Sequence, residues 1–66
     1  MYAIIDKRTG KYLYGTDHRF SPPRQRTSEH RLKVYETQEE AALDLKLRKC
    51  GPAYAVMKIS VQITPD

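Results

Sequence analysis

Residues 37–52 read TQEEAALDLKLRKCGP, and this stretch decides which fold the rest of the chain can build. Thr37 can accept a hydrogen bond from the first turn of a helix, and the glutamate three positions later can complete a capping box. Acidic residues in the first turn and basic residues in the last suit the helix dipole. Gly51 is suited to a left-handed stop, and the proline after it prevents continuation. The sequence therefore predicts an α-helix from about Gln38 to Lys49.

The apolar residues of this helix fall on two sides of it at 100° per residue. One stripe holds Ala41, Ala42 and Leu45, and the other holds Leu43, Leu47 and Cys50. One sheet cannot cover both stripes. The second stripe has three explanations: the segment 15–30 covers it through Phe20, it forms a homodimer seam, or it receives a partner.

Strand-forming residues open the chain at 2–5 and return at 11–14, after a turn that contains Gly10. This pattern predicts a β-hairpin with a three- or four-residue loop. A four-residue loop pairs Asp6 with Lys11 and places Ile4 opposite Leu13, whereas a three-residue loop pairs Ile5 with Leu13. Because a one-residue slip exchanges the faces, the sequence leaves open which tyrosines point outward.

Two further strands flank the helix. Residues 31–35 alternate charged and apolar side chains, which predicts a strand with Leu32 and Val34 facing the core, and residues 53–63 form a long amphipathic strand. The stretch 15–30 has no apolar period and contains two adjacent prolines, so we expect a long basic loop there.

The expected order of elements is therefore β-β-β-α-β in one domain spanning residues 1–66. Two packed layers are the most that a chain of this length supports. The sequence predicts an α+β fold with a mainly antiparallel four-stranded sheet and one helix on one face. The order of the strands stays open: the two strands that flank the helix could be parallel neighbours or be separated by another strand.

Composition bears on the class of function. The chain has 66 residues and a formal net charge of +4, which favours an acidic protein surface or a nucleic acid as partner. A domain this thin has few residues left to build the walls of a substrate cleft, so we expect no enzyme. The single cysteine and the absence of a long apolar run predict an intracellular, cytoplasmic location without a membrane span.

Residues that could carry catalysis or hold a metal do not form a known pattern. His18, His30, Asp17 and Cys50 do not have the ligand spacing of a zinc site. Cys50 follows the C-terminal end of the helix, where the dipole disfavours a thiolate. The glycines are scattered and form no phosphate cradle. We therefore expect no catalytic residue, no metal and no cofactor.

Cations and aromatic rings supply the candidate binding residues. Planar guanidiniums on a proline-stiffened segment suit carboxylates, phosphates and stacking, and strand tyrosines flanked by lysines suit a protein interface or a base-stacking platform. The predicted partner-binding residues are Arg19, Phe20, Arg24, Arg26, Arg31, Tyr12, Tyr14, Lys33 and Tyr35. The predicted oligomer seam consists of Leu43, Leu47 and Cys50.

The leading hypothesis is a small non-enzymatic protein that binds an acidic macromolecular surface, with a protein preferred over a nucleic acid. The alternative is a nucleic-acid-binding module that uses the same cations against phosphates. In length, hairpin start, Thr-x-x-Glu helix start and lack of a catalytic signature, the chain resembles the small accessory proteins of phages and mobile elements. That resemblance implies a role as an inhibitor or adaptor of a host enzyme or complex.

Overall fold

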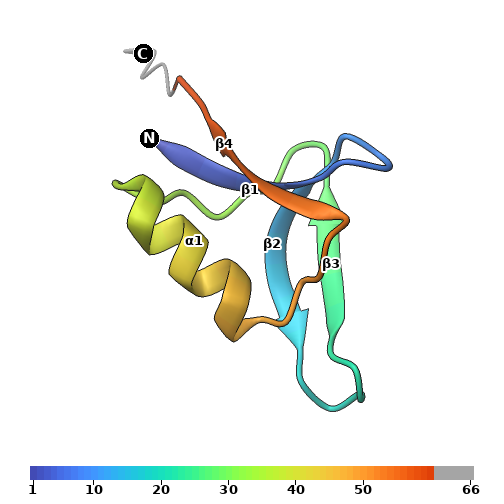
Figure 1. Ribbon diagram of the computed structural model, residues 1–66. Coiled ribbons are helices and arrows are strands. Elements are labelled where there is room, and N and C mark those ends of the chain that lie inside the picture. The colour runs from blue at the N-terminus through green and yellow to red at the C-terminus, as the bar shows by residue number, and fades with distance from the viewer. Residues whose placement is uncertain (61–66) are drawn as a thin grey trace.

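The computed structural model describes residues 1–60 of the chain, and it has the predicted α+β architecture (Figure 1). Its elements are β1 (Tyr2–Asp6), β2 (Tyr12–Asp17), β3 (Arg24–Ser28), α1 (Gln38–Leu47) and β4 (Tyr54–Lys58). The strands form one antiparallel sheet in the order β3-β2-β1-β4. The strands on either side of the helix in sequence therefore lie at opposite edges of the sheet. Within residues 1–60, no helix is long and apolar enough to cross a membrane.

The first hairpin has the register of the four-residue loop. Ile5 pairs with Tyr12, and the Asp6 backbone N–H donates to the Lys11 carbonyl over 2.9 Å. Gly10 closes the turn at a φ of 73°, a conformation that glycine adopts without steric cost, and its N–H donates to the Asp6 carbonyl. This register puts Ile4 and Leu13 on the same face of the sheet, where both side chains are fully buried.

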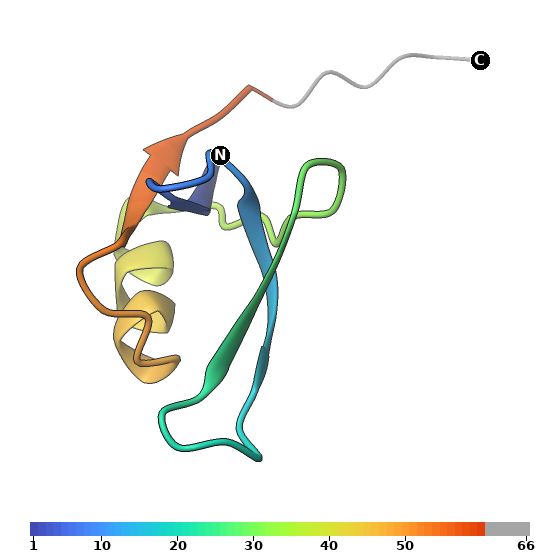
Figure 2. The ribbon, with the colours of Figure 1, turned by 90° about the vertical axis from the view of Figure 1, so that its right-hand side faces the viewer.

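The predicted long loop at 15–30 is wrong. β2 continues to Asp17, and β3 pairs with it along its whole length, with a bulge between Leu13 and Gly15 (Figures 1 and 2). Residues 18–23 form the tip that joins the two strands. The segment shows no apolar period because polar residues occupy the face of this hairpin that is turned toward α1. There Thr16 and Gln25 hydrogen-bond to each other, where hydrophobic side chains would otherwise pack. Apolar periodicity cannot detect a hairpin whose two faces are both polar.

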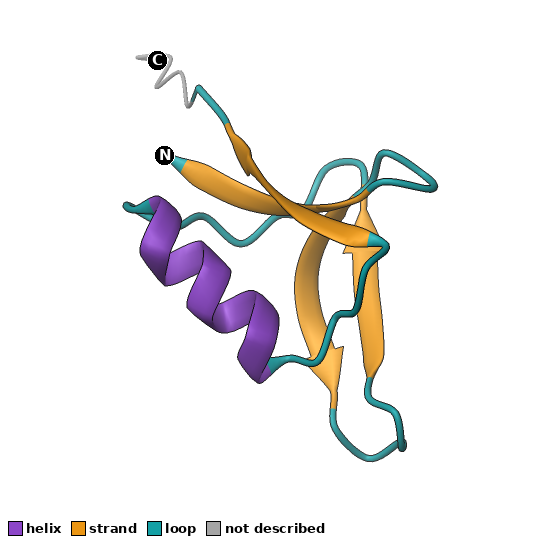
Figure 3. Ribbon diagram, in the orientation of Figure 1, coloured by secondary structure: helices purple, strands orange, loops and turns teal. Residues whose placement is uncertain are grey.

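The predicted strand at 31–35 is also wrong, although this segment makes backbone hydrogen bonds to both β1 and β2. The Lys33 N–H donates to the Leu13 carbonyl at 3.1 Å, and Tyr35 exchanges two 2.8 Å backbone hydrogen bonds with Tyr2. These bonds satisfy backbone groups where β1 and β2 separate beyond their turn, and Figure 3 shows the segment as a loop. The burial differs from the expected one at two positions, since Tyr35 is buried and Val34 is exposed, while Leu32 is half-buried.

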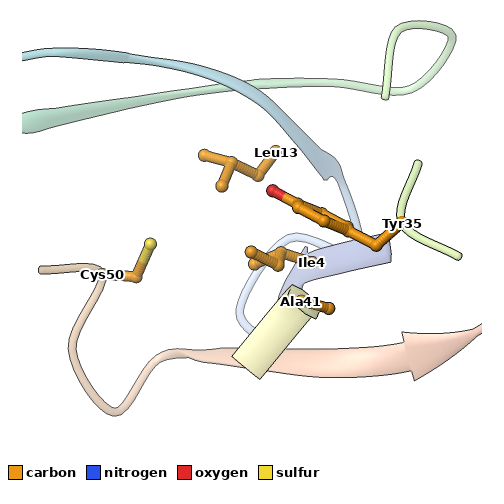
Figure 4. Packing of buried hydrophobic residues seen from close by; sticks show 5 residues of the cluster. All are labelled: Ile4, Leu13, Tyr35, Ala41 and Cys50. Atoms are coloured by element: carbon orange, nitrogen blue, oxygen red, sulfur yellow. The ribbon is translucent and has the colours of Figure 1, made fainter. Parts of the chain in front are cut away.

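β4 pairs with β1 over five residues, from Tyr2 opposite Lys58 to Asp6 opposite Tyr54. Tyr54 and Val56 pack against the core, while Met57, on the other parity, is exposed. The core cluster consists of Ile4, Leu13, Tyr35, Ala41 and Cys50 (Figure 4). The predicted continuation of this strand beyond residue 60 lies outside the described residues.

The helix begins as predicted, because the Thr37 hydroxyl oxygen accepts a 3.2 Å hydrogen bond from the Glu40 backbone N–H. It ends at Leu47, two residues before the predicted end, and Gly51 has the expected positive φ of 77°. Leu43 and Leu47 are 60% and 66% exposed. The explanation that the 15–30 segment covers them through Phe20 is therefore wrong.

Candidate functional site

The turn end of the β2–β3 hairpin carries an open concavity of about 360 Å³. Its lining includes three arginines, one aromatic ring and one carboxylate, and consists of Asp17, Arg19, Phe20, Arg24, Gln25 and Arg26. The antiparallel register puts Arg24 opposite Asp17 and Arg26 opposite Gly15, so both arginines lie on the face of the ribbon that is turned away from α1. We call Arg19, Phe20, Arg24 and Arg26 the tip cluster.

Asp17 organises two of these arginines. Arg19 donates to its carboxylate through Nε at 2.9 Å and through a terminal nitrogen at 2.7 Å, and Arg26 lies at 3.3 Å. The Asp17 side chain is only 8% exposed, whereas those of Arg19 and Arg26 are 80% and 55% exposed. Hydrogen bonds from the Arg19 side chain and backbone hold the pKa of Asp17 well below its usual range. One ionised carboxylate thus orients two guanidiniums that remain accessible.

Arg24 is held by stacking instead of by an acid. Its guanidinium carbon lies 4.5 Å from the centroid of the exposed Phe20 ring. A guanidinium stacked on a ring keeps the N–H donors at its edge available for a carboxylate or a phosphate. The tip cluster therefore presents an apolar ring and oriented cationic donors on the same surface.

The other predicted binding residues lie elsewhere. Arg31 lies over the Tyr14 ring at 5.5 Å, at the bulge of β2, and Tyr12 is half-buried opposite Ile5. Tyr35 is in the core, and Lys33 lies beside its ring. The structure therefore brings Arg19, Phe20, Arg24 and Arg26 together and separates them from the tyrosines.

A second polar cluster, which the sequence reasoning missed, is centred on Asp44 of α1. Its carboxylate accepts hydrogen bonds from the Tyr35 hydroxyl and from Arg48 Nε, the latter at 2.7 Å, and Lys33 lies 3.7 Å away. Burial alone would raise the pKa of Asp44, but the hydrogen bonds from Tyr35 and Arg48 outweigh it and hold that pKa below its ordinary value. Burial, reinforced by the same hydrogen bond, raises the pKa of Tyr35.

Arg48 links this cluster to the base of the hairpin. It donates to the Thr16 hydroxyl oxygen at 2.8 Å, Thr16 donates to the Gln25 side-chain oxygen at 2.7 Å, and the Gln25 amide returns to the Arg48 carbonyl at 2.6 Å. The sequence does contain a pattern that indicates this cluster: Asp44 and Arg48 are spaced i,i+4 on the same side of the helix as Ala41. We infer a structural role: this circuit fixes the hairpin relative to α1.

The predicted seam residues are divided by the structure. Leu43 and Leu47 are exposed, whereas Cys50 is buried in the core cluster. The two leucines are thus the accessible part of the predicted seam, and the seam itself stays a prediction. Burial raises the pKa of the Cys50 thiol, which disfavours the nucleophilic thiolate. His18 and His30 are both exposed, and no metal-binding group of three or more His, Cys, Asp or Glu side chains is present among residues 1–60.

Comparison with known proteins gives no relative: the chain matches no protein-family model, no curated protein and no solved structure. The tip cluster offers hydrogen-bond donors, positive charge and one ring, which bind anionic groups next to apolar ones.

Proposed function

We propose that the protein is a non-enzymatic binding module that engages an acidic surface of another protein through the tip cluster. The observation that carries this proposal is the grouping of three arginines and an exposed ring around one concavity that contains a single carboxylate. Arginine and aromatic side chains are the residues that most often dominate the binding energy of protein interfaces. An inhibitor or adaptor needs no more than such a surface, and a reducing intracellular location suits the unpaired Cys50.

A protein partner is favoured over a nucleic acid by the composition of the tip. A phosphate-backbone binder needs a broad row of cations, whereas here the arginines are confined to one hairpin end and Asp17 lies among them. The stacked pair of Arg24 and Phe20 mixes charge with apolar area, as interface centres do. The observation that favours the alternative is that Arg24 and Arg26 share one face of a two-stranded ribbon, a shape that some DNA-binding proteins use.

The test is capture from cell lysate with immobilised protein, comparing two variants of equal net charge. Arg24→Glu with Arg26→Glu reverses the tip cluster, and Lys7→Glu with Lys46→Glu makes the same charge change at exposed positions outside it. We expect the wild type and the lysine variant to retain the same protein partner and the arginine variant to lose it. Equal capture by all three would overturn the assignment of the site.

Nuclease treatment and salt separate the two classes of partner. A protein partner should remain bound after DNase and RNase treatment. The nucleic-acid alternative predicts loss of the captured material after nuclease treatment. It also predicts an affinity for any oligonucleotide that falls linearly, on logarithmic axes, with salt concentration.

A further inference from the structure

β3 is an edge strand whose outer side has no strand beside it in the described part of the chain. The sheet order places β2 on one side of β3 and nothing on the other, and Figure 1 shows β3 at the margin of the sheet. Within residues 1–60, the backbone hydrogen bonds of β3 are those of its ladder with β2. Its outward N–H and C=O groups are therefore available to an additional strand.

The side chains of this edge set the chemistry of what could pair with it. Arg24 and Arg26 occupy alternate positions of β3 and project from the face turned away from α1. On the other face, Gln25 is already bonded to the Arg48 carbonyl and to Thr16. In an antiparallel ladder, a residue opposite each arginine lies about 5 Å away, within reach of its guanidinium.

A second copy of this chain does not fit the edge. Antiparallel pairing of two β3 strands would bring the Arg24 and Arg26 rows of both copies together, and like charges on neighbouring strands destabilise a ladder. An acidic segment with carboxylates at alternate positions reverses the sign of that interaction. Each of those carboxylates would face one guanidinium.

We propose that the β3 edge accepts an extended acidic segment of the partner protein as a fifth strand. Main-chain hydrogen bonds to β3 supply affinity, and carboxylates at positions i and i+2 of the segment bind Arg24 and Arg26. This inference rests on the proposed function, because it specifies the part of an acidic protein that the hairpin recognises. Phe20 and Arg19 then contact residues that follow the added strand at the tip.

A set of labelled heptapeptides tests the strand geometry by fluorescence anisotropy. The parent is TEVEVET, which places its glutamates on one parity, and TEEVVET has the same composition but no two glutamates at positions i and i+2. Two further versions of the parent carry two backbone N-methyl groups each, either on the first two glutamates or on the two valines. Because N–H groups alternate in direction along a strand, only one of these versions removes the hydrogen bonds that face β3.

We expect one N-methylated peptide to bind at least about tenfold more weakly than the parent and the other to stay within about threefold. TEEVVET should also bind at least about tenfold more weakly, because it cannot place carboxylates opposite both Arg24 and Arg26 at once. Arg24→Glu with Arg26→Glu should reduce affinity for the parent at least about tenfold, and Lys7→Glu with Lys46→Glu should change it less than about threefold. Far-UV circular dichroism checks that both variants are folded.

Two results would overturn the inference, and they differ in whether the proposed function survives. If all four peptides bind equally and Arg24→Glu with Arg26→Glu still weakens them, strand addition is wrong but recognition of acidic surfaces survives. If none of the peptides binds while a DNA oligonucleotide does, with a steep salt dependence, the proposed function and the strand addition both fail.

Discussion

The β1–β4–α1 half of the molecule and the outer half of the β2–β3 hairpin are held in place by different forces. The first half supplies most of the core, with Ile4 and Ala41 fully buried. In the second half, from Gly15 to Ser28, no residue is buried, and the contacts are the strand ladder, the arginines around Asp17 and the link from Arg48. Substitutions in the first half should therefore change stability, and substitutions at the hairpin tip should change binding.

The largest expected effect is that of Ile4→Ala. Loss of a fully buried isoleucine side chain should lower the free energy of unfolding by about 3 kcal/mol, because the lost transfer energy adds to the cost of a cavity. Arg26→Ala, at the exposed tip, should change it by less than about 0.5 kcal/mol. Urea unfolding followed by circular dichroism measures both.

A domain of this size has little stability to spare, so Ile4→Ala could leave too little folded protein for a full transition. In that case Ile4→Val, which should cost about 1 kcal/mol, preserves the comparison with Arg26→Ala. Equal destabilisation by the core and tip substitutions would contradict the division of roles between the two halves.

A smaller loss is expected from Asp44→Asn, which removes the charge on which Tyr35 and Arg48 converge. We expect a loss of about 2 kcal/mol at neutral pH, since hydrogen bonds to charged groups contribute more than neutral ones. Glu39→Gln, at an exposed position in the first turn of the same helix, is the matched control and should cost less than about 0.5 kcal/mol.

The same variant should alter the acid limb of the stability curve. The pKa of Asp44 is lower in the folded protein than the unfolded value of about 3.9. Its contribution is therefore complete above that pH and is lost as the pH falls through the lowered folded pKa. Asp44→Asn should make unfolding less dependent on pH below about 5 than it is in the wild type. A parallel shift of the whole curve, with its shape unchanged, would show that the carboxylate charge is not what stabilises the link.

These two halves also differ in how far the sequence predicts them. The helix and the first hairpin can be predicted because Thr37, Gly10 and the apolar positions around Ile4 carry strong local signals. The second hairpin cannot be predicted from apolar periodicity, because the face turned toward α1 carries Thr16 and Gln25, which hydrogen-bond to each other. Both side chains also hydrogen-bond to Arg48, a residue distant from them in sequence.

The candidate site was predicted in part. Arg19, Phe20, Arg24 and Arg26 were identified by residue type, but their convergence follows from the hairpin that was not predicted. Tyr35 was expected at an interface and lies in the core. An alternating pattern marks one face of a strand without saying which face is buried, and here the loop geometry turned the ring inward.

The smallest predicted effect concerns Asp17, whose carboxylate already occupies Arg19 and Arg26. Asp17→Asn removes the charge that orients these two guanidiniums, so the affinity for the acidic peptide TEVEVET should fall about threefold. Asparagine retains a side-chain oxygen for the backbone N–H of Arg19, so the turn should persist. Glu29→Gln makes the same charge change just beyond β3 and should have a smaller effect. Stronger binding of Asp17→Asn, with an intact fold, would mean that Asp17 competes with the peptide for the arginines instead of orienting them.

The most direct test of the central claim, that recognition belongs to the hairpin and stability to the opposite half, is a titration of ¹⁵N-labelled protein with TEVEVET followed by amide chemical shifts. We expect perturbations concentrated in residues 16–28, with the amides of α1 and β4 nearly unchanged. Perturbations concentrated on α1, around the exposed Leu43 and Leu47, with the hairpin amides unmoved, would contradict it.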